Sequence, residues 1–275
     1  MKHAVEMIQD AIQQGANIIC LQELFASPYF PAHRMSKVKA IAEHAESIPG
    51  PITNTLAEIS RKAKIVIVGG SIYERDETGE QDHFFNSSPI IDNGRIVAVH
   101  RKAHIPNDPG YTERTYFEPG DRAVTVAQTS KGKIGVGICF DQWFPEVGSM
   151  ASRKGAELLV YPTAIGETSE QVVGAIERDN GFWHVKLQNA LKGQAAMGNM
   201  FVAMVNRVGY EGETRFFGGS AIYNYNGETM KQIGSRREGI AIEDCKISLA
   251  QTLKDAWMFN DLRRPELYGD DDNNS

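Results

Sequence analysis

Three reactive side chains each stand directly after a run of residues typical of a buried strand. Glu23 follows the run 17–21, Lys102 follows 95–101, and Cys139 follows 133–138. In α/β proteins, binding groups gather beyond the carboxyl ends of strands. If these strands are neighbours, a carboxylate, an ammonium and a thiol converge, a set suited to nucleophilic chemistry.

Cys139 stands at the tip of its strand, shortly before a predicted helix near 146–154. A helix N-terminus and a nearby ammonium stabilise a thiolate, so this position predicts a nucleophile. Taken alone, an inert buried thiol is the commoner finding. That interpretation also applies to Cys20, which lies inside its strand, and to Cys245, which has no activating neighbours in the sequence.

Glu23 precedes Leu24 and Phe25, so its carboxyl is expected in a partly apolar cleft, where it could act as a general base. An isolated glutamate in a loop is more commonly salt-bridged. Lys102 follows Arg101, and two successive basic residues usually lie on a solvated surface. If the strand continues through them, however, the two side chains point in opposite directions.

Other chemical motifs are weaker or absent in the sequence. The pair Gly135 and Gly137 lacks the third glycine of a dinucleotide loop, and neither a phosphate-binding loop nor a nucleophile elbow occurs. No cluster of metal-ligating residues stands out, so we expect neither a metal nor a cofactor. His104 could be a general base, although a histidine in a loop more often makes structural hydrogen bonds.

The composition predicts a globular protein whose partner is a small molecule. Hydrophobic residues make up 41% of the 275 residues, enough for a substantial core. A net charge of −6, with neither sign gathered into a long block, argues against nucleic acid or a membrane as partner. Three distant cysteines suggest neither disulfides nor zinc, and no apolar run approaches the roughly 20 residues that span a bilayer. We expect a cytoplasmic protein.

The elements predicted around these residues alternate between helices and buried strands. The chain opens on a helix that stops at Gly15, and Asp92-Asn93-Gly94 predicts a hairpin turn. This alternation with hairpins suggests mixed sheets covered by helices on the outside, although periodicity alone also allows a doubly wound single sheet. Further strands are predicted at 65–70, 84–91, 123–127, 158–161, 201–205, 219–225, 228–233 and 239–243, with helices over 52–63 and 181–199.

Taken together, these segments resemble the nitrilase superfamily of carbon-nitrogen hydrolases, over nearly the whole chain. The resemblance implies an α/β fold, a four-layer α-β-β-α sandwich of two mixed β-sheets. Three ordered motifs at suitable spacing make a chance match improbable. They are Leu21-Gln22-Glu23-Leu24-Phe25, Arg101-Lys102 with His104-Ile105-Pro106, and Gly137-Ile138-Cys139-Phe140-Asp141.

The resemblance implies a role for each matching residue. Glu23 would be the general base, Cys139 the nucleophile and Lys102 the electrostatic stabiliser, while Glu113 matches the second glutamate that orients the others. The hypothesis is covalent acyl transfer, in which Lys102 and the backbone N–H of Phe140 hold the oxyanion. Glu23 would pass the proton to departing ammonia and then activate water.

Within the superfamily, four strings resemble the N-carbamoylputrescine amidases: 105–111, 139–146, 161–166 and 217–220. The implied reaction turns N-carbamoylputrescine into putrescine, ammonia and carbon dioxide. A cationic substrate tail favours a carboxylate or an aromatic face, whereas a carboxylate tail would favour an arginine, which 105–111 lacks. The substrate-binding candidates are Tyr29, Asp108, Tyr111, Trp143, Ala164 and Glu167. The segment 167–186 does not align cleanly, so His184 receives no role.

Two alternatives stay open at this point. One is a β-ureidopropionase-like enzyme or an ω-amidase, acting on an amide that bears a carboxylate. The other is a catalytically idle relative that serves as a binding or assembly protein.

The resemblance also bears on domain organisation. It implies one catalytic domain over 1–260, without the first strand usual in relatives, followed by a tail over 261–275. Family members usually associate through the helix bearing the nucleophile and through C-terminal segments, so the resemblance implies a homodimer or a larger homo-oligomer.

Overall fold

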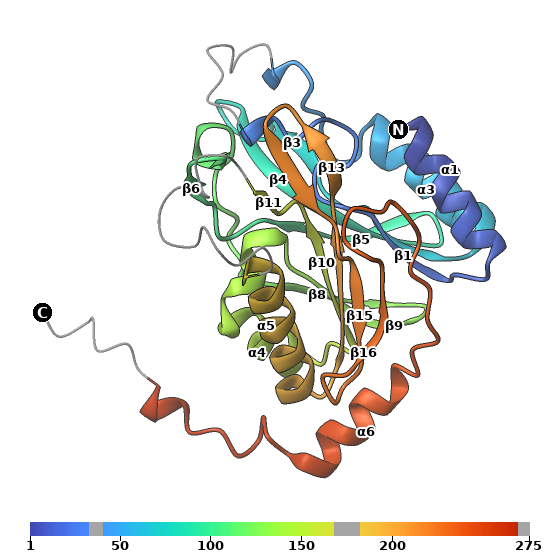
Figure 1. Ribbon diagram of the computed structural model, residues 1–275, viewed down its shortest axis with the longest axis vertical. Helices are drawn as coiled ribbons and strands as arrows, with labels where there is room; N and C mark the ends of the chain where they lie inside the picture. Colours follow the sequence, from blue (N-terminus) through green and yellow to red (C-terminus); the bar gives the residue numbers. More distant parts are fainter. Residues whose placement is uncertain (33–40, 168–181, 269–275) are drawn as a thin grey trace, which may run out of the picture.

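Two β-sheets lie face to face between two pairs of helices in the computed structural model, which describes residues 1–32, 41–167 and 182–268 (Figure 1). The longer helices are α1 (Lys2–Gln13), α3 (Pro51–Ala63), α4 (Pro145–Arg153), α5 (Phe182–Gly198) and α6 (Ser248–Trp257). Short 3-10 helices are η1 (Phe30–Ala32), η2 (Glu113–Thr115), η3 (Cys139–Trp143) and η4 (Pro265–Leu267).

The first sheet carries the residues that follow two of the predicted strands. Its members are β1 (Ile18–Cys20), β2 (Val66–Val68), β3 (Ile72–Asp76), β4 (His83–Asp92) and β5 (Arg95–Arg101). The strand order is β1-β2-β4-β3, with β5 also paired to β4. β1 and β2 are parallel, whereas β4 is antiparallel to both β2 and β5. The strands β1 and β5 therefore run in the same direction and end at the same edge.

The second sheet has the order β16-β15-β12-β10-β9-β8. Its strands are β8 (Thr125–Thr129), β9 (Gly132–Val136), β10 (Leu158–Thr163), β12 (Phe201–Asn206), β15 (Ala221–Tyr223) and β16 (Thr229–Gln232). The central strands β9, β10 and β12 are parallel. Smaller sheets join β11 (Gly166–Glu167) to β13 (Val208–Glu211) and β14 (Thr214–Phe217), and β6 (Asn107–Asp108) to β7 (Tyr111–Thr112).

Three apolar clusters hold the four layers together. Val68 and Ile90 of the first sheet pack against Val136 and Val160 of the second, forming the layer between the sheets. Outside the first sheet, α1 and α3 contribute Ile8 and Leu56. Outside the second, α4 and α5 contribute Val147, Leu187 and Leu191. The predicted α-β-β-α sandwich of two mixed sheets is thus confirmed, and the single doubly wound sheet is excluded.

Local sequence explains the boundaries of several elements. Helix α3 begins with Pro51, and the Gly50 N–H donates to Thr53 Oγ1 at 2.7 Å, which caps the first turn. The predicted hairpin turn joins β4 to β5 through Asn93 and Gly94, both with positive φ. The prediction that the chain opens on a helix is confirmed by α1.

The predicted strand at 239–243 is wrong. These residues form no regular element, although Ile240 packs with the cluster beneath α1 and α3. A strand needs a hydrogen-bonding partner, and in the described part of the chain no strand pairs with the outer edge of β1. Helix α6 was not predicted. Most of the unaligned segment, 168–181, and the acidic end, 269–275, lie outside the described residues.

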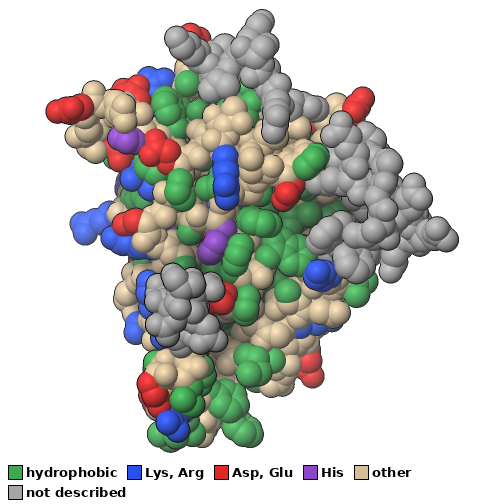
Figure 2. Space-filling model, turned by 90° about the vertical axis from the view of Figure 1, so that its left-hand side faces the viewer, with side chains coloured by type: hydrophobic (Ala, Val, Ile, Leu, Met, Phe, Trp, Pro, Cys, Tyr) green, Lys and Arg blue, Asp and Glu red, His purple; other side chains and the backbone are tan. Residues whose placement is uncertain are grey.

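The surface mixes acidic and basic side chains. Figure 2 shows a face on which charges of both signs are interspersed and hydrophobic side chains gather near the centre. None of the helices in the described part of the chain has the length and apolar character needed to cross a bilayer.

Candidate active site

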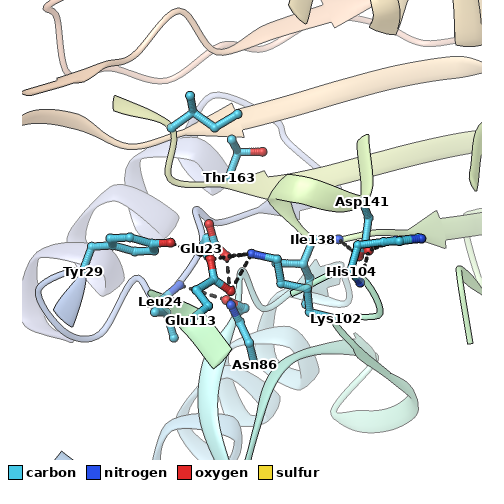
Figure 3. Close-up of polar contacts among 12 residues, drawn as sticks. Glu23, Leu24, Tyr29, Asn86, Lys102, His104, Glu113, Ile138, Asp141 and Thr163 are labelled. Atoms are coloured by element: carbon cyan, nitrogen blue, oxygen red, sulfur yellow. Dashed lines mark hydrogen bonds and ion pairs between the residues drawn. The ribbon is translucent and has the colours of Figure 1, made fainter. Parts of the chain in front are cut away.

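A buried cluster of charged side chains lies beyond the shared edge of β1 and β5 (Figure 3). Lys102 Nζ lies 2.9 Å from Glu23 Oε1 and 2.6 and 2.7 Å from the two carboxylate oxygens of Glu113. All three side chains are fully buried. Arg101 points the other way, where it pairs with Glu74 and Asp76. The two successive basic residues thus face opposite sides, as the strand geometry requires.

One carboxylate oxygen of Glu23 has no hydrogen-bond donor among the described residues. Its Oε1 accepts hydrogen bonds from Lys102 and from Asn86 Nδ2, the latter at 2.8 Å. Its Oε2 is buried and has no hydrogen-bond partner among the described residues. A buried carboxylate oxygen without a donor is costly unless a ligand or a proton uses it. This oxygen can therefore receive a proton.

The turn that carries Glu23 is held from the second sheet. Leu24 has φ +47°, a left-handed conformation that is unfavourable for a residue with a Cβ. Arg207, directly after β12, donates from Nη2 to the carbonyl oxygens of Glu23, Leu24 and Ser27 at 3.1, 2.8 and 3.1 Å. These bonds to main-chain carbonyls stabilise the strained backbone.

Cys139 begins η3 in a second strained turn. Its φ is +46°, and the residue is only 3% exposed. The backbone of Ala164 lies close to the thiol, where it acts to lower the pKa of Cys139. Phe140 lies in the first turn of η3, where N–H groups have no intrahelical partner, so its N–H is free to bind an anionic oxygen.

The charges of the cluster determine how its members are protonated. Burial lowers the pKa of Lys102, but the carboxylates of Glu113 and Glu23 outweigh burial and raise it, so the ammonium is retained. For Glu113, burial raises the pKa to about 7 despite the opposing charge of Lys102. One ammonium is thus shared by two carboxylates.

Burial opposes the stabilisation of a Cys139 thiolate that the sequence predicts. Burial and the charge of Glu23 raise its pKa well above the usual value, and Lys102 offsets this only in part. The sulfur therefore carries its proton in the free protein. Ionisation must be coupled to a base, and Glu23 is the neighbouring carboxylate with a free oxygen.

Three of the predicted substrate-binding residues lie beside the cluster, in one aromatic group that includes Phe216. The Tyr29 hydroxyl donates to Glu113 Oε1 at 2.5 Å, so it orients this carboxylate. The Tyr111 hydroxyl donates to the Gly166 carbonyl and accepts from the Gly166 N–H, both at 2.8 Å. Ala164 is buried between these rings and Cys139.

The other three candidates are not brought into this group. Trp143 lines a groove between α4 and α5 that Phe259, Asn260 and Arg263 also line, and it packs against the apolar cluster that includes Cys139. Asp108 is exposed on the β6–β7 hairpin. Glu167 pairs with Arg215 through the backbone of β11 and β14, and its side chain lies outside the described structure.

Several residues of the site were missed in the sequence. Asn86 lies in β4 directly before Ser87 and Ser88, and its signal was a run of polar residues between apolar ones in a predicted strand. Arg207 gave no local signal because the carbonyl oxygens that it binds in the turn of Glu23 are more than 170 residues away. His104 makes structural hydrogen bonds to Asp141, as a loop histidine usually does. In residues 1–32, 41–167 and 182–268, no group of three or more acidic, histidine or cysteine side chains is arranged to hold a metal.

The sequence model of one family, "Carbon-nitrogen hydrolase", matches residues 1–255. The chain belongs to the carbon-nitrogen hydrolase family. The resemblance to the nitrilase superfamily is thereby confirmed. An N-carbamoylputrescine amidase from Solanum lycopersicum is 34% identical over 274 residues, covering 96% of this chain and 87% of the relative. A citrullinase from Francisella tularensis is also 34% identical, covering 95% and 88%.

A solved structure supports the same assignment for this carbon-nitrogen hydrolase. The carbon-nitrogen hydrolase of Helicobacter pylori G27 superimposes with a TM-score of 0.86 at 29% identity, covering 97% of this chain and 90% of that one. The clustered Glu23, Lys102, Glu113 and Cys139 therefore lie in a fold shared with a hydrolase of the family.

Proposed function

We propose that this chain is a thiol amidohydrolase that converts N-carbamoylputrescine and water into putrescine, ammonia and carbon dioxide. The observation that carries the proposal is the sealed cluster in which Lys102 binds Glu23 and Glu113, while Glu23 Oε2 stays free beside the Cys139 turn. It provides a nucleophile, a base and a cation without further groups.

The first half of the reaction forms a covalent intermediate. Glu23 takes the thiol proton as Cys139 Sγ attacks the carbamoyl carbon. Lys102 Nζ and the Phe140 N–H stabilise the negative oxygen of the tetrahedral adduct. The proton held by Glu23 passes to the terminal nitrogen, the bond between carbon and this nitrogen breaks, and ammonia leaves. A thiocarbamate on Cys139 results.

The second half releases the enzyme. Glu23 removes a proton from water, and the resulting hydroxide attacks the thiocarbamate carbon. The carbon–sulfur bond breaks, and the thiolate of Cys139 recovers its proton from Glu23. The released carbamate loses carbon dioxide to give putrescine. Glu113, hydrogen-bonded to Tyr29 and Lys102, orients the lysine throughout both halves.

The substrate proposal draws support from the relatives and from the charges near the site. N-carbamoylputrescine and citrulline both carry a terminal ureido group on an alkyl chain, and enzymes named for acting on them are 34% identical to this chain. The loop 105–111 contains no basic residue and presents Asp108 to solvent. Arg207 is committed to three carbonyls and Glu211, so it is poorly placed to bind a substrate carboxylate.

An ammonia-release assay tests the proposal. The panel contains N-carbamoylputrescine, citrulline, N-carbamoyl-β-alanine and an ω-amide, each with the wild type and with Cys139→Ala. We expect N-carbamoylputrescine to give the highest kcat/KM, and Cys139→Ala to release no ammonia above background. Near-normal turnover by Cys139→Ala would overturn the mechanism.

The panel also separates the alternatives. A clear preference for N-carbamoyl-β-alanine or the ω-amide would favour the β-ureidopropionase-like or ω-amidase alternative, and a preference for citrulline would favour a citrullinase. No turnover of any member, with Cys139 no more reactive toward iodoacetamide than an ordinary thiol, would favour the idle binding protein.

We also propose that the chain forms a homo-oligomer. The segment 257–268 exposes large apolar side chains: Trp257, Met258, Phe259, Leu262, Leu267 and Tyr268. The groove that contains Trp143 has a volume of about 590 Å³, and the buried amide of Gln142 on its wall has no partner among the described residues. Light scattering should report a dimer or larger assembly that Leu262→Asp weakens. A wild-type monomer at micromolar concentration would contradict this.

A further inference from the structure

A single carboxylate, Asp141, links the turn of Cys139 to the segment that follows Lys102 (Figure 3). Its Oδ2 accepts from the Ile138 N–H at 2.8 Å and from His100 Nε2 at 3.1 Å. Its Oδ1 accepts from the His104 N–H at 3.0 Å and from His104 Nδ1 at 2.7 Å. The side chain is fully buried. All four lone-pair positions of the carboxylate are therefore used.

The two sides of this link belong to different sheets. Ile138 follows β9 of the second sheet and precedes Cys139, whereas His100 lies in β5 of the first sheet and His104 stands two residues after Lys102. His104 also stacks on Phe144, with ring centroids 3.7 Å apart. Asp141 thus fixes the nucleophile's turn relative to the lysine across the gap between the sheets.

The hydrogen bonds of Asp141 hold the turn in which Cys139 has a strained backbone conformation. A left-handed conformation at a residue with a Cβ persists only where its surroundings hold it. Burial raises the pKa of Asp141, but hydrogen bonds from His100 and His104 outweigh it and hold this pKa well below its usual range. Asp141 therefore stays ionised, and the facing ring nitrogens carry hydrogens.

We propose that Asp141, with His104, is a positioning residue that holds Cys139 and Lys102 in register for attack on the substrate. The inference rests on the proposed function, because it assigns Cys139 and Lys102 to the same reaction. Asp141 itself does not touch the substrate. Its loss should therefore act on the chemical step more than on substrate binding.

Steady-state kinetics of Asp141→Asn test the inference. The asparagine amide would point an N–H group at one of the donors that Asp141 now accepts from. We expect kcat to fall about 100-fold, the effect of misplacing a reacting group by about 1 Å, while KM stays near the wild-type value. A kcat within about twofold of the wild type would overturn the inference.

A milder pair of variants guards against a folding defect. The His104 side chain is 30% exposed, so the protein should tolerate changes there. His104→Ala removes the bond to Oδ1 and should lower kcat about tenfold. His104→Asn places an amide N–H where Nδ1 stands and should restore most of this loss. A purely structural role would lower the melting temperature in both variants without this recovery of kcat.

A chemical readout separates this inference from the choice of substrate. The rate at which iodoacetamide alkylates Cys139, followed by peptide mass spectrometry, depends on the thiol and Glu23 but not on N-carbamoylputrescine. Asp141→Asn and His104→Ala should both slow it, with Cys20 and Cys245 as internal references. The control is His3→Asn, which removes an exposed histidine–carboxylate contact with Glu238 and should change nothing. If the wild type fails on N-carbamoylputrescine, the proposed substrate is wrong, and unchanged alkylation in Asp141→Asn would still overturn the positioning role.

Discussion

The turn after β1 and the turn after β9 both contain a residue with strained backbone, and side chains of opposite charge stabilise them. Each contains a non-glycine residue in left-handed conformation, Leu24 at φ +47° and Cys139 at φ +46°. Arg207 holds the first turn by donating to carbonyl oxygens, whereas Asp141 holds the second by accepting from N–H groups. The hydrogen bonds of Arg207 and those of Asp141 each link the first sheet to the second.

The two turns differ in which of their backbone groups are bound. Arg207 binds carbonyl oxygens of the first turn and leaves the Glu23 carboxylate to Lys102 and Asn86. Asp141 accepts from the Ile138 N–H of the second turn, and the Phe140 N–H, two residues further along, is the group proposed to bind the oxyanion. Arg207 thus stabilises the turn of the proposed base through its acceptors, and Asp141 stabilises the turn of the proposed nucleophile through its donors.

The largest effect on turnover should come from removing the charge of Glu23, the proposed base. Glu23→Gln keeps the shape of the side chain but cannot accept the thiol proton, so turnover should fall about 10²- to 10⁴-fold. Ammonia release measures this, and Cys139 alkylation should slow in parallel. The matched control is Glu118→Gln, which changes an exposed glutamate paired with His83. Equal activity in both variants would show that Glu23 is not the base.

Removing Arg207, the cation that stabilises the turn of Glu23, should have the next largest effect. Arg207→Met leaves several buried carbonyl oxygens without a donor and should lower the free energy of unfolding by about 3 kcal/mol. Urea titration of this variant measures the loss. Arg122→Met removes an exposed arginine and should cost almost nothing. If Arg207→Met lowers the free energy of unfolding by less than about 0.5 kcal/mol, the turn that carries Glu23 keeps its conformation without Arg207.

The proton on Glu113 should make stability depend on pH. Its pKa is raised by burial to about 7, so the folded protein binds a proton that the unfolded chain has lost above about pH 4.5. Stability from this group is therefore lost as pH rises from about 4.5 to 7, by at most about 1.4 kcal/mol per pH unit.

Glu113→Gln should abolish this part of the pH dependence. Melting curves at pH 5, 6 and 7.5 measure it, and the wild type should lose stability relative to the variant as pH rises. The opposite trend would mean that Glu113 is fully ionised by Lys102 in the folded protein. In that case Glu113, beside Glu23, would be ionised in the folded protein, as Asp141 is beside Cys139.

The smallest effect should come from a strained residue that carries no chemistry. Lys64 has φ +55° at the end of α3, where glycine is preferred, and its side chain is exposed. Lys64→Gly should raise the free energy of unfolding by about 0.5–1 kcal/mol with unchanged kcat. A loss of stability would show that left-handed backbone costs little in this fold, and would weaken the comparison of the two catalytic turns.

Much of the fold could be predicted because buried strands and their following residues share a local pattern. The apolar runs ahead of Glu23, Lys102 and Cys139 predicted strands that do end at the site. The strand expected at 239–243 was wrong because a period-two pattern does not show whether a partner strand exists. The hairpin of β13 and β14 and helix α6 were also missed.

The contacts within the site were harder to predict than its members. Tyr29 was expected to bind substrate, yet its hydroxyl bonds Glu113, which is 84 residues away in the sequence. Trp143 follows the nucleophile closely but turns into the groove of α4 and α5. Such outcomes depend on packing between layers, which no local pattern contains. For the same reason, the raised pKa of Cys139 could not be foreseen from its place before a helix.

The strand β1 differs from the centre of the second sheet in how firmly it is paired. It has three residues and, among the residues that the structure describes, one partner, β2. The six residues of β10 are buried and paired on both sides, by β9 and β12. Local opening costs least at short edge strands. Glu23 lies three residues beyond β1, while Cys139 follows β9, a strand paired on both sides. We therefore expect the part of the molecule that carries the proposed base to open at a lower free energy than the part that carries the proposed nucleophile.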